Sequence, residues 1–293
     1  LITNSNKIIM KYSILVNTCD KFADCWNPFF QLFEKFWPDY KGVVYLNTEY
    51  QECEYMLTGG GKIVSVKGCK VNNYPTNKRA TWSQCLYWAL QKIETDLVLY
   101  LQEDYFFKDK VKTDIINEFA ELMLQNKDIK CIHFTDQSVL ASNKSEFEHL
   151  YDIQKKQKYR VSCQAALWRK DELFELLRIR EDAWQFERYG SKRSELLNHR
   201  YLVIDKSWVK LNEFEIIPYI FTGIVKGRWI REAKTLFDRE NIEMDFSIRG
   251  FVDEPQSKSF SIKRIIRNRY NMYVLPIINW FDRLAIKFGL HNR

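Results

Sequence analysis

Residues 97–107 of this 293-residue chain read Leu-Val-Leu-Tyr-Leu-Gln-Glu-Asp-Tyr-Phe-Phe. A continuous apolar run of this length is typical of a strand buried on both faces of a sheet. The run ends at Glu103 and Asp104, which are followed at once by three aromatic residues. Open α/β sheets bind their ligands outside the carboxyl ends of the strands. The stretch therefore predicts a buried strand with paired acids at its ligand-binding end, and a plain solvated loop is an equal alternative at this point.

Helix-like and strand-like segments alternate on both sides of this stretch. Apolar runs predict strands at 12–17, 43–46, 62–66, 96–101, 130–134, 159–168, 201–204 and 216–221. Apolar residues at helical spacing predict helices around 22–33, 82–93, 113–126 and 170–178. This alternation favours parallel βαβ units. The expected fold class is α/β, a Rossmann-type, mostly parallel sheet flanked by helices, with a helical C-terminal extension.

The composition is that of a globular chain. Hydrophobic residues make up 46% and aromatic residues 15% of it. Seven scattered cysteines form no Cys-x-x-Cys pair, so no zinc knuckle or redox motif is visible along the sequence. Buried free thiols in a reducing compartment fit this pattern, and we expect a cytoplasmic protein without a signal peptide or membrane span.

The positive charge is concentrated near the C-terminus. Residues 256–293 contain eight Lys or Arg residues and one acidic residue, Asp282. The net charge of this segment is therefore +7, the same as that of the whole chain. Pro276 suits the first turn of a helix, and residues 277–288 give that helix a broad apolar face with Asp282, Arg283 and Lys287 opposite. We therefore expect one domain at 10–255, large enough to contain a catalytic site, and a basic amphipathic tail at 256–293.

The expected partner of this tail is an anionic membrane surface. The alternative is a helix docked on the core. Binding of nucleic acid is disfavoured because the body is close to neutral and the aromatic residues are not interleaved with the basic run.

The order of these elements resembles a glycosyltransferase of the GT-A type. The resemblance covers about residues 12–198, from the first strand, which ends in Thr18-Cys19-Asp20, through Gln102-Glu103-Asp104. It implies a GT-A-like fold in which the acidic strand end holds a divalent cation (Mn²⁺ or Mg²⁺) on the diphosphate of a nucleotide sugar. The chain departs from the family at Gln102, where a first acid is expected, so the implied metal ligands are Asp104 and Glu103.

The resemblance also implies residues that bind the donor. Thr18 and Asp20 stand where this type contacts the nucleobase or ribose. If no metal binds, basic side chains must offset the charge of the departing diphosphate. The candidates are Arg79 and Lys226, with Lys78 and Arg228 beside them, and simple solvation is the alternative for each.

Inverting members carry a general base about eighty residues beyond the acidic motif. Glu187 lies 83 residues after Asp104 and is the candidate base. Trp184 and Phe186 flank it and are candidates to raise its pKa and to stack on an acceptor sugar. The alternative for Glu187 is a salt bridge to Arg188 or Arg193. His199 is a candidate metal ligand, with a structural role as its alternative.

The sequence thus predicts an enzyme that moves a sugar from a nucleotide sugar to a glycan or lipid-linked acceptor in cell-surface polysaccharide synthesis. The reaction is expected to be an inverting single displacement at a membrane surface. The alternatives are a retaining glycosyltransferase, a sugar nucleotidyltransferase, or a basic-tailed nucleic-acid-binding protein.

Overall fold

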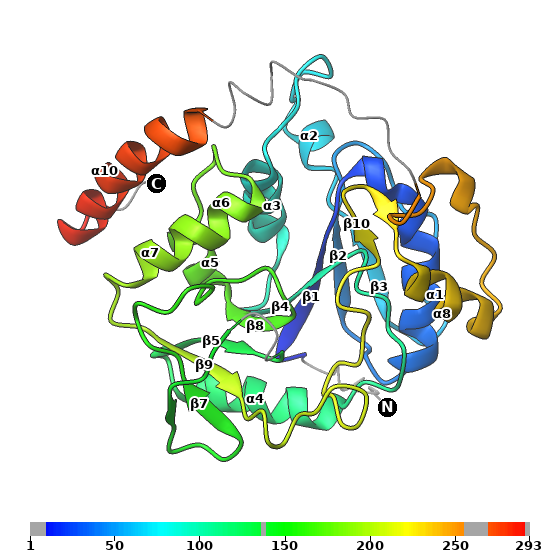
Figure 1. Ribbon diagram of the computed structural model, residues 1–293, viewed down its shortest axis with the longest axis horizontal. Helices are drawn as coiled ribbons and strands as arrows, with labels where there is room; N and C mark the ends of the chain where they lie inside the picture. The colour runs from blue at the N-terminus through cyan, green and yellow to red at the C-terminus, as the bar shows by residue number, and fades with distance from the viewer. Residues whose placement is uncertain (1–9, 136–138, 255–268, 291–293) are drawn as a thin grey trace, which may run out of the picture.

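The computed structural model describes residues 10–135, 139–254 and 269–290. Its centre is a nine-stranded sheet in the order β3-β2-β1-β4-β8-β5-β9-β7-β6, with helices on both faces (Figure 1). The strands are β1 (Tyr12–Asn17), β2 (Val43–Asn47), β3 (Lys62–Ser65), β4 (Leu97–Gln102), β5 (Ile129–His133), β6 (Asn143–Lys144), β7 (Leu150–Asp152), β8 (Ala166–Arg169) and β9 (Arg200–Ile204). A separate hairpin joins β10 (Ile224–Val225) to β11 (Arg228–Trp229).

The longer helices, apart from the one at 231–240, lie close to ranges that the apolar spacing predicts. The longer ones are α1 (Trp26–Phe36), α3 (Trp82–Lys92), α4 (Thr113–Gln125), α5 (Lys170–Leu176), α8 (Arg231–Glu240) and α10 (Leu275–Lys287). The short ones are η1 (Asp20–Cys25), α2 (Gly68–Val71), α6 (Ala183–Gln185), η2 (Phe186–Gly190), α7 (Ser191–Ser194), η3 (Phe246–Ile248) and η4 (Tyr270–Val274).

The sheet is mixed, and its parallel half lies at the N-terminal side. Strands β3, β2, β1 and β4 pair in parallel, as the βαβ pattern predicts. Strand β8 runs antiparallel between β4 and β5, and β5 pairs in parallel with β9. Strands β1 and β4 are buried along almost their whole length, which explains their continuous apolar sequences. The predicted α/β fold with a mostly parallel sheet and a C-terminal helix is confirmed.

Two predicted strands differ from the structure. The strand expected at 159–168 is reduced to β8, because the backbone before it bonds to side chains instead: Val161 N donates to Ser191 Oγ (3.0 Å) and Cys163 N to Glu187 (2.7 Å). Residues 216–221 form no strand. They run antiparallel beside the segment that follows the acidic pair, and Ile220 N donates to the carbonyl of Phe106 (2.9 Å).

The three aromatic residues after the acidic pair belong to the core. Tyr105, Phe106 and Phe107 are all buried. Tyr105 stacks on Tyr219 with ring centroids 4.7 Å apart, and Phe106 packs against Trp229 at 5.9 Å. These rings therefore attach the segments around Tyr219 and Trp229 to the end of β4. They are part of the core and do not line a ligand site.

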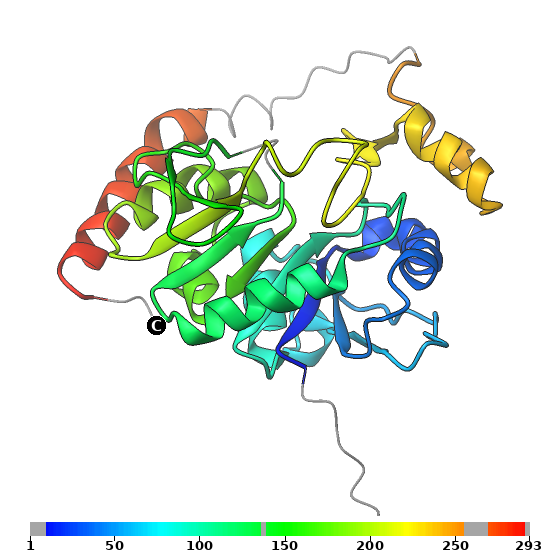
Figure 2. The same cartoon turned by 90° about the horizontal axis from the view of Figure 1, so that it is seen from below.

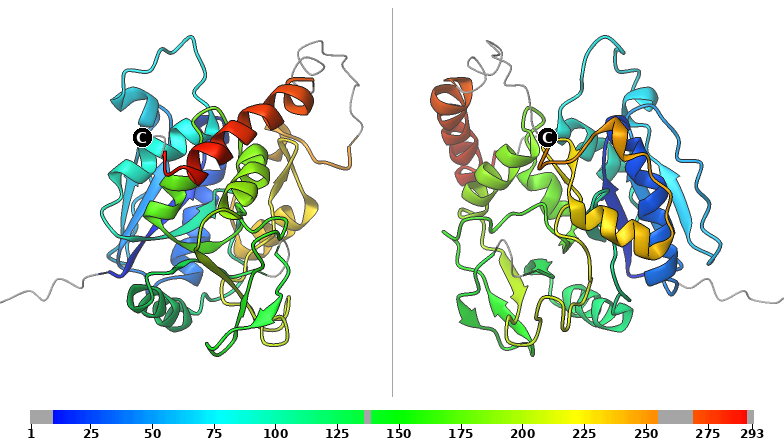
Figure 3. Two further views of the ribbon diagram at one scale, coloured as in Figure 1. Left: turned by 90° about the vertical axis from the view of Figure 1, so that its left-hand side faces the viewer. Right: turned by 45° about the vertical axis from the view of Figure 1, so that its right-hand side comes forward.

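Helix α10 lies along the outer side of α7, at the opposite side of the molecule from α1 and α8 (Figures 1 and 3). Its inward face contains Asp282, which is 6% exposed and forms ion pairs with Arg178 and Arg180. The sequence predicts Asp282 on the side of the helix opposite its apolar face, and in the structure this side lies against the core. Asp282 supplies the carboxylate partner that the buried guanidinium group of Arg178 requires. Within the described residues, no helix has the length and apolarity that a bilayer crossing requires.

Candidate functional site

The candidate site forms where several strand ends meet at one edge of the sheet. Asn17 at the end of β1 lies level with Asn47 of β2 and with Gln102 of β4. Strand β8 is antiparallel to β4, and Ala166 pairs with Tyr100, so the residues that precede β8 reach the same edge. Figure 2 gives a second view of this edge of the sheet. The topology thus gathers chain segments that are far apart in sequence.

Glu103 and Asp104 lie at this edge, and each is only 7% exposed. Asp104 Oδ2 accepts hydrogen bonds from Thr222 Oγ1 (2.6 Å) and from the backbone N–H of Ile224 (3.2 Å). The backbone carbonyl of Asp104 also accepts a hydrogen bond from this segment, from Gly223 N (2.8 Å). A turn 118 residues further along the chain therefore encloses this carboxylate.

Burial dominates the electrostatics of the pair. Burial, followed by the neighbouring charge of Asp104, holds the pKa of the Glu103 carboxyl well above its usual range. Burial also raises the pKa of Asp104, against the hydrogen bonds from Thr222 and Ile224, which lower it. A positive charge beside two adjacent buried carboxyl groups stabilises their ionised form. Their oxygen atoms are the donors that Mg²⁺ and Mn²⁺ prefer, so the residues present fit a divalent cation.

Gln102 has a structural role. Its Nε2 donates to the carbonyl of Cys163 (3.1 Å) and to the hydroxyl of Tyr105 (3.0 Å). A carboxylate at this position would set acceptor against acceptor at the Cys163 carbonyl. This explains why an amide stands where the GT-A resemblance expects a first acid.

Glu187 comes to the same edge through Cys163. Its Oε1 accepts hydrogen bonds from Cys163 N (2.7 Å) and from Ser162 Oγ (3.3 Å). Burial raises the pKa of Glu187, and these two hydrogen bonds oppose the rise. Among the described residues no ion pair to Glu187 is found, and the suggested partner Arg193 instead pairs with Glu181 (2.6 Å).

One residue thus joins the acidic strand end to Glu187. The carbonyl of Cys163 receives Gln102 and Tyr105, and the amide of Cys163 donates to Glu187. The backbone of the segment before β8 thus bonds both to the residues that flank the acidic pair and to Glu187.

The side chains of Thr18 and Asp20 accept hydrogen bonds from within the protein. Thr18 Oγ1 accepts from the indole of Trp26 (3.0 Å). The carboxylate of Asp20 accepts from three consecutive backbone N–H groups, those of residues 49–51, at 2.8–3.2 Å. The prediction that these two side chains bind the nucleotide directly is not supported by these contacts. Asp20 instead positions the loop after β2 at the site edge.

The basic side chains predicted to bind the diphosphate differ in their exposure and in their hydrogen bonds. Arg79 is exposed, and its charge lies close enough to the Cys19 thiol to lower that pKa slightly against the larger effect of burial. Lys226 is exposed at the tip of the β10–β11 hairpin, where its φ of 54° and the 79° of Gly227 form the turn. Arg228 is held by the carbonyl of Phe251 (2.8 Å).

Arg249 was missed by the sequence reasoning. Its guanidinium group pairs with Asp24 (Nε–Oδ2, 2.6 Å) and lies over the ring of Phe22 at 4.6 Å. It also lies close enough to Glu103 to lower the pKa of that carboxyl against the effects of burial. Its position in an irregular segment 146 residues after Glu103 gives no periodic signal that would have revealed it.

The two aromatic residues beside Glu187 have opposite surroundings. Trp184 on α6 is 78% exposed, so its indole is open to contact with another molecule. Phe186 is 2% exposed and packs on Trp82 with ring centroids 5.3 Å apart. The prediction that Phe186 stacks on an acceptor is therefore wrong for this conformation, because its ring is already covered.

His199 lies away from this edge, beside the start of β9. Its Nδ1 is 2.6 Å from Glu172 Oε2, a carboxylate that is itself buried and also bonded by Tyr201. This partner supports the structural role that the sequence left open for His199.

Comparisons with known proteins return solved structures only. No family model and no curated sequence matches this chain. The chain is similar to S. aureus TarS 1–349, with 14% identity over 67% of this chain and 58% of TarS 1–349, at a TM-score of 0.40. It is also similar to glucosyl-3-phosphoglycerate synthase from Mycobacterium tuberculosis in complex with Mn²⁺ and UDP-glucose, with 11% identity over 86% of this chain and 84% of that one, at a TM-score of 0.45.

A third similar structure is mannosyl-3-phosphoglycerate synthase from Rubrobacter xylanophilus, with 11% identity over 56% and 55% of the two chains and a TM-score of 0.31. The chain spans less than two thirds of TarS 1–349. All three TM-scores lie below 0.5, so we base the functional proposal on the residues of this chain.

Proposed function

We propose that this chain is a nucleotide-sugar-dependent glycosyltransferase that transfers a sugar to a hydroxyl group of a glycan or lipid-linked acceptor with inversion. The observation that supports the proposal is the double use of Cys163, which is hydrogen-bonded both to Gln102, next to the acidic pair, and to Glu187. An inverting displacement needs two such groups, one at the leaving diphosphate and one at the attacking hydroxyl.

The donor end consists of the acidic pair and the cations around it. Glu103 and Asp104 would hold a divalent cation, which would offset the negative charge that grows on the leaving diphosphate. The exposed side chains of Arg79 and Lys226 are free to approach the phosphates from solvent. Arg249 adds a fixed positive charge beside Glu103.

Glu187 would act as the general base. Its Oε1 is engaged by Cys163 and Ser162, so Oε2 is the oxygen that would receive the proton of the acceptor hydroxyl. As that proton leaves, the hydroxyl oxygen forms a bond to the anomeric carbon. The bond from the anomeric carbon to the diphosphate breaks, and the diphosphate leaves with the electron pair. A pKa raised by burial makes the carboxylate a better proton acceptor.

The acceptor would lie against Trp184. The exposed indole is three residues before Glu187 along a helical segment, a spacing that brings side chains to one face. Flat aromatic surfaces of this kind suit the apolar faces of sugar rings.

The acceptor is proposed to lie at an anionic membrane, because of the outer face of α10. Several of its apolar side chains are exposed, whereas the polar Asn279 and Asp282 are buried on its inward face together with Leu275 and Ile286. The exposed apolar residues are Ile277, Trp280 and Phe281 on α10, with Tyr273 of η4 before it and Phe288 directly after it. The sequence adds seven net positive charges over 256–293, which suits a negatively charged bilayer surface better than a second protein.

The function is tested by supplying the protein with a panel of nucleotide sugars and following transfer and slow donor hydrolysis. We expect one donor class to be consumed, with release of a nucleoside diphosphate and inversion at the anomeric carbon. Retention of configuration would reject the role of Glu187 as base. Release of pyrophosphate would instead indicate a nucleotidyltransferase, and no turnover or binding of any donor would reject the proposal.

A further inference from the structure

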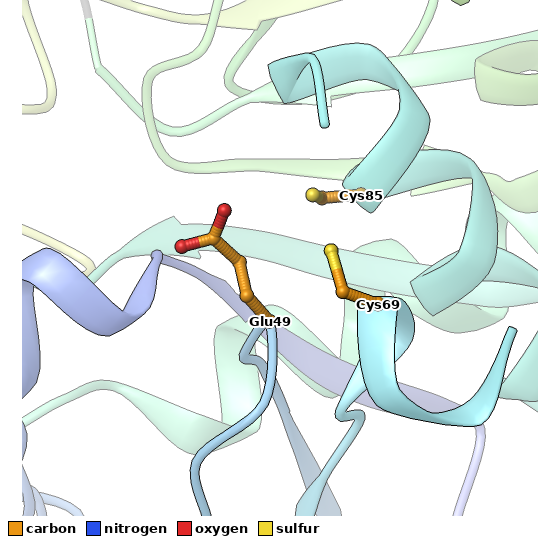
Figure 4. Close-up of side chains that lie close together, drawn as sticks. All are labelled: Glu49, Cys69 and Cys85. Carbon is orange, nitrogen blue, oxygen red and sulfur yellow. The ribbon is translucent and has the colours of Figure 1, made fainter. Parts of the chain in front are cut away.

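A second group of metal-ligand side chains lies outside the acidic pair. Glu49 follows β2, Cys69 is in α2 and Cys85 is in α3. One ligand atom from each lies within 4.8 Å of the other two. Figure 4 shows the carboxylate and the two sulfur atoms turned toward a shared space from three separate segments.

The chemistry of this group differs from that of Glu103 and Asp104. Both cysteines are buried, whereas Glu49 is partly exposed and leaves one side of the group open. Two sulfurs and one carboxylate oxygen are a soft ligand set, which favours Zn²⁺ over Mg²⁺ or Mn²⁺. Three protein ligands leave the fourth position of a tetrahedral ion to water.

We propose that Glu49, Cys69 and Cys85 form a binding site for one thiophilic divalent cation, of which Zn²⁺ is the expected physiological example. The two thiols release their protons to solvent, and each thiolate donates an electron pair to the cation, so no oxidant is needed. The ion joins α2 and α3 to the loop after β2.

The surroundings of the group support this assignment. Glu49 is already oriented, because its Oε2 accepts from the backbone of Asp20 (3.3 Å) and its own N–H donates to the carboxylate of Asp20 (2.8 Å). An outer partner of this kind is typical of metal-ligating carboxylates.

The cation site is independent of the proposed sugar transfer. Its test uses metal binding alone, so a failure of either proposal leaves the other standing.

The test is a titration of the reduced 293-residue chain with Co²⁺, which reports thiolate ligation through a charge-transfer absorption in the near ultraviolet. We expect one equivalent of Co²⁺ to bind with this absorption and to be displaced by Zn²⁺. Cys69→Ser and Cys85→Ser should each lose the absorption, whereas Cys53→Ser, a half-buried cysteine outside the group, should keep it.

A variant of the carboxylate ligand covers the case in which a buried cysteine cannot be replaced without unfolding the protein. Glu49→Gln should keep the thiolate absorption but weaken Co²⁺ binding by about tenfold or more. The proposal is overturned if the reduced wild-type protein shows no thiolate absorption, or if the absorption persists in Cys69→Ser and Cys85→Ser. A disulfide between Cys69 and Cys85 that resists mild reduction would also overturn it.

Discussion

Glu187 is the residue on which the proposed chemistry depends most. Its carboxylate accepts from Cys163 and Ser162, and an amide could keep only part of this arrangement. We expect Glu187→Gln to lower the transfer rate by about 10²–10⁴-fold, the usual contribution of general base catalysis, with nucleotide affinity unchanged. Glu213→Gln, on an exposed surface, is the matched control. Equal loss of transfer and of nucleotide binding, measured by calorimetry, would assign Glu187 a structural role.

The pH dependence of transfer follows from the same side chain. Burial raises the pKa of Glu187 above 4.5, and a general base acts only when it is deprotonated. The transfer rate should therefore rise with pH through a value above 4.5, and the acidic limb should be absent from the residual activity of Glu187→Gln. Rates over a pH series at saturating donor measure this limb. A limb unchanged in the variant would assign the titration to another group.

At the scale of elements, the end of β4 and the turn before β10 form one unit. The turn bonds to Asp104 through Thr222 and Ile224, and Gly223 lies directly against the ring of Phe106. A Cβ on Gly223 would meet that ring at 2.3 Å and the carbonyl of Asp104 at 3.1 Å, so a larger residue must push the turn away from the acidic pair.

Gly223→Ala tests this unit. We expect it to lower the free energy of unfolding by about 1–3 kcal/mol through overpacking and to weaken nucleotide binding, because Asp104 loses its hydrogen-bond partners. Urea unfolding and calorimetry give the two quantities. Gly59→Ala, where the new Cβ meets only ordinary contacts, should leave both unchanged. Unaltered nucleotide affinity in a destabilised Gly223→Ala would separate the turn from the site.

The strands β1 to β5, β8 and β9 and the longer helices except α8 could be predicted from the sequence, and the physical reason is periodicity. The short strands and helices and α8 were not predicted. Strand β1 agrees with the predicted range 12–17, and α3 and α4 each agree to within one residue at their ends. Buried strands and amphipathic helices show such patterns because their apolar side chains recur at the spacing that places them against one core. The segments at 160–164 and 216–221 do not, because their backbone bonds go to single side chains or to an irregular partner.

The individual contacts of the site could be predicted only in part. Glu103 and Asp104 were found because they end an apolar run. The cluster of Glu49, Cys69 and Cys85 was missed, since its members are 20 and 16 residues apart and come together only through the packing of α2 and α3. Asp20 was predicted to bind the nucleotide. Nothing in the sequence indicates that its carboxylate accepts hydrogen bonds from the three backbone N–H groups at 49–51.

At the scale of the whole molecule, the outward apolar face of α10 predicts binding to an anionic bilayer. The double variant Trp280→Ser/Phe281→Ser removes two exposed rings from the helix without touching the buried Asp282. We expect it to reduce binding to vesicles that contain anionic lipid by at least about tenfold, since burial of each ring contributes more than 1 kcal/mol. Transfer to a water-soluble acceptor should be unchanged.

Vesicle sedimentation measures this binding, and neutral vesicles should bind less than anionic ones. Met56→Ser and Ile248→Ser remove exposed apolar side chains elsewhere and should have no effect. Undiminished sedimentation of the α10 double variant would reject this face as the membrane contact. A dimer that dissociates in the same variant would identify a second copy of the chain as the partner.

The central claim is that the end of β4 binds a nucleotide sugar through a divalent cation, and titration of nucleoside diphosphates with and without Mn²⁺ tests it most directly. Wild-type protein should bind one class of nucleoside diphosphate, with affinity that increases when Mn²⁺ is present. Asp104→Asn should lose that increase, because an amide is a weaker and uncharged ligand. No binding of any nucleoside diphosphate to the folded wild-type protein, with or without Mn²⁺, would contradict the account.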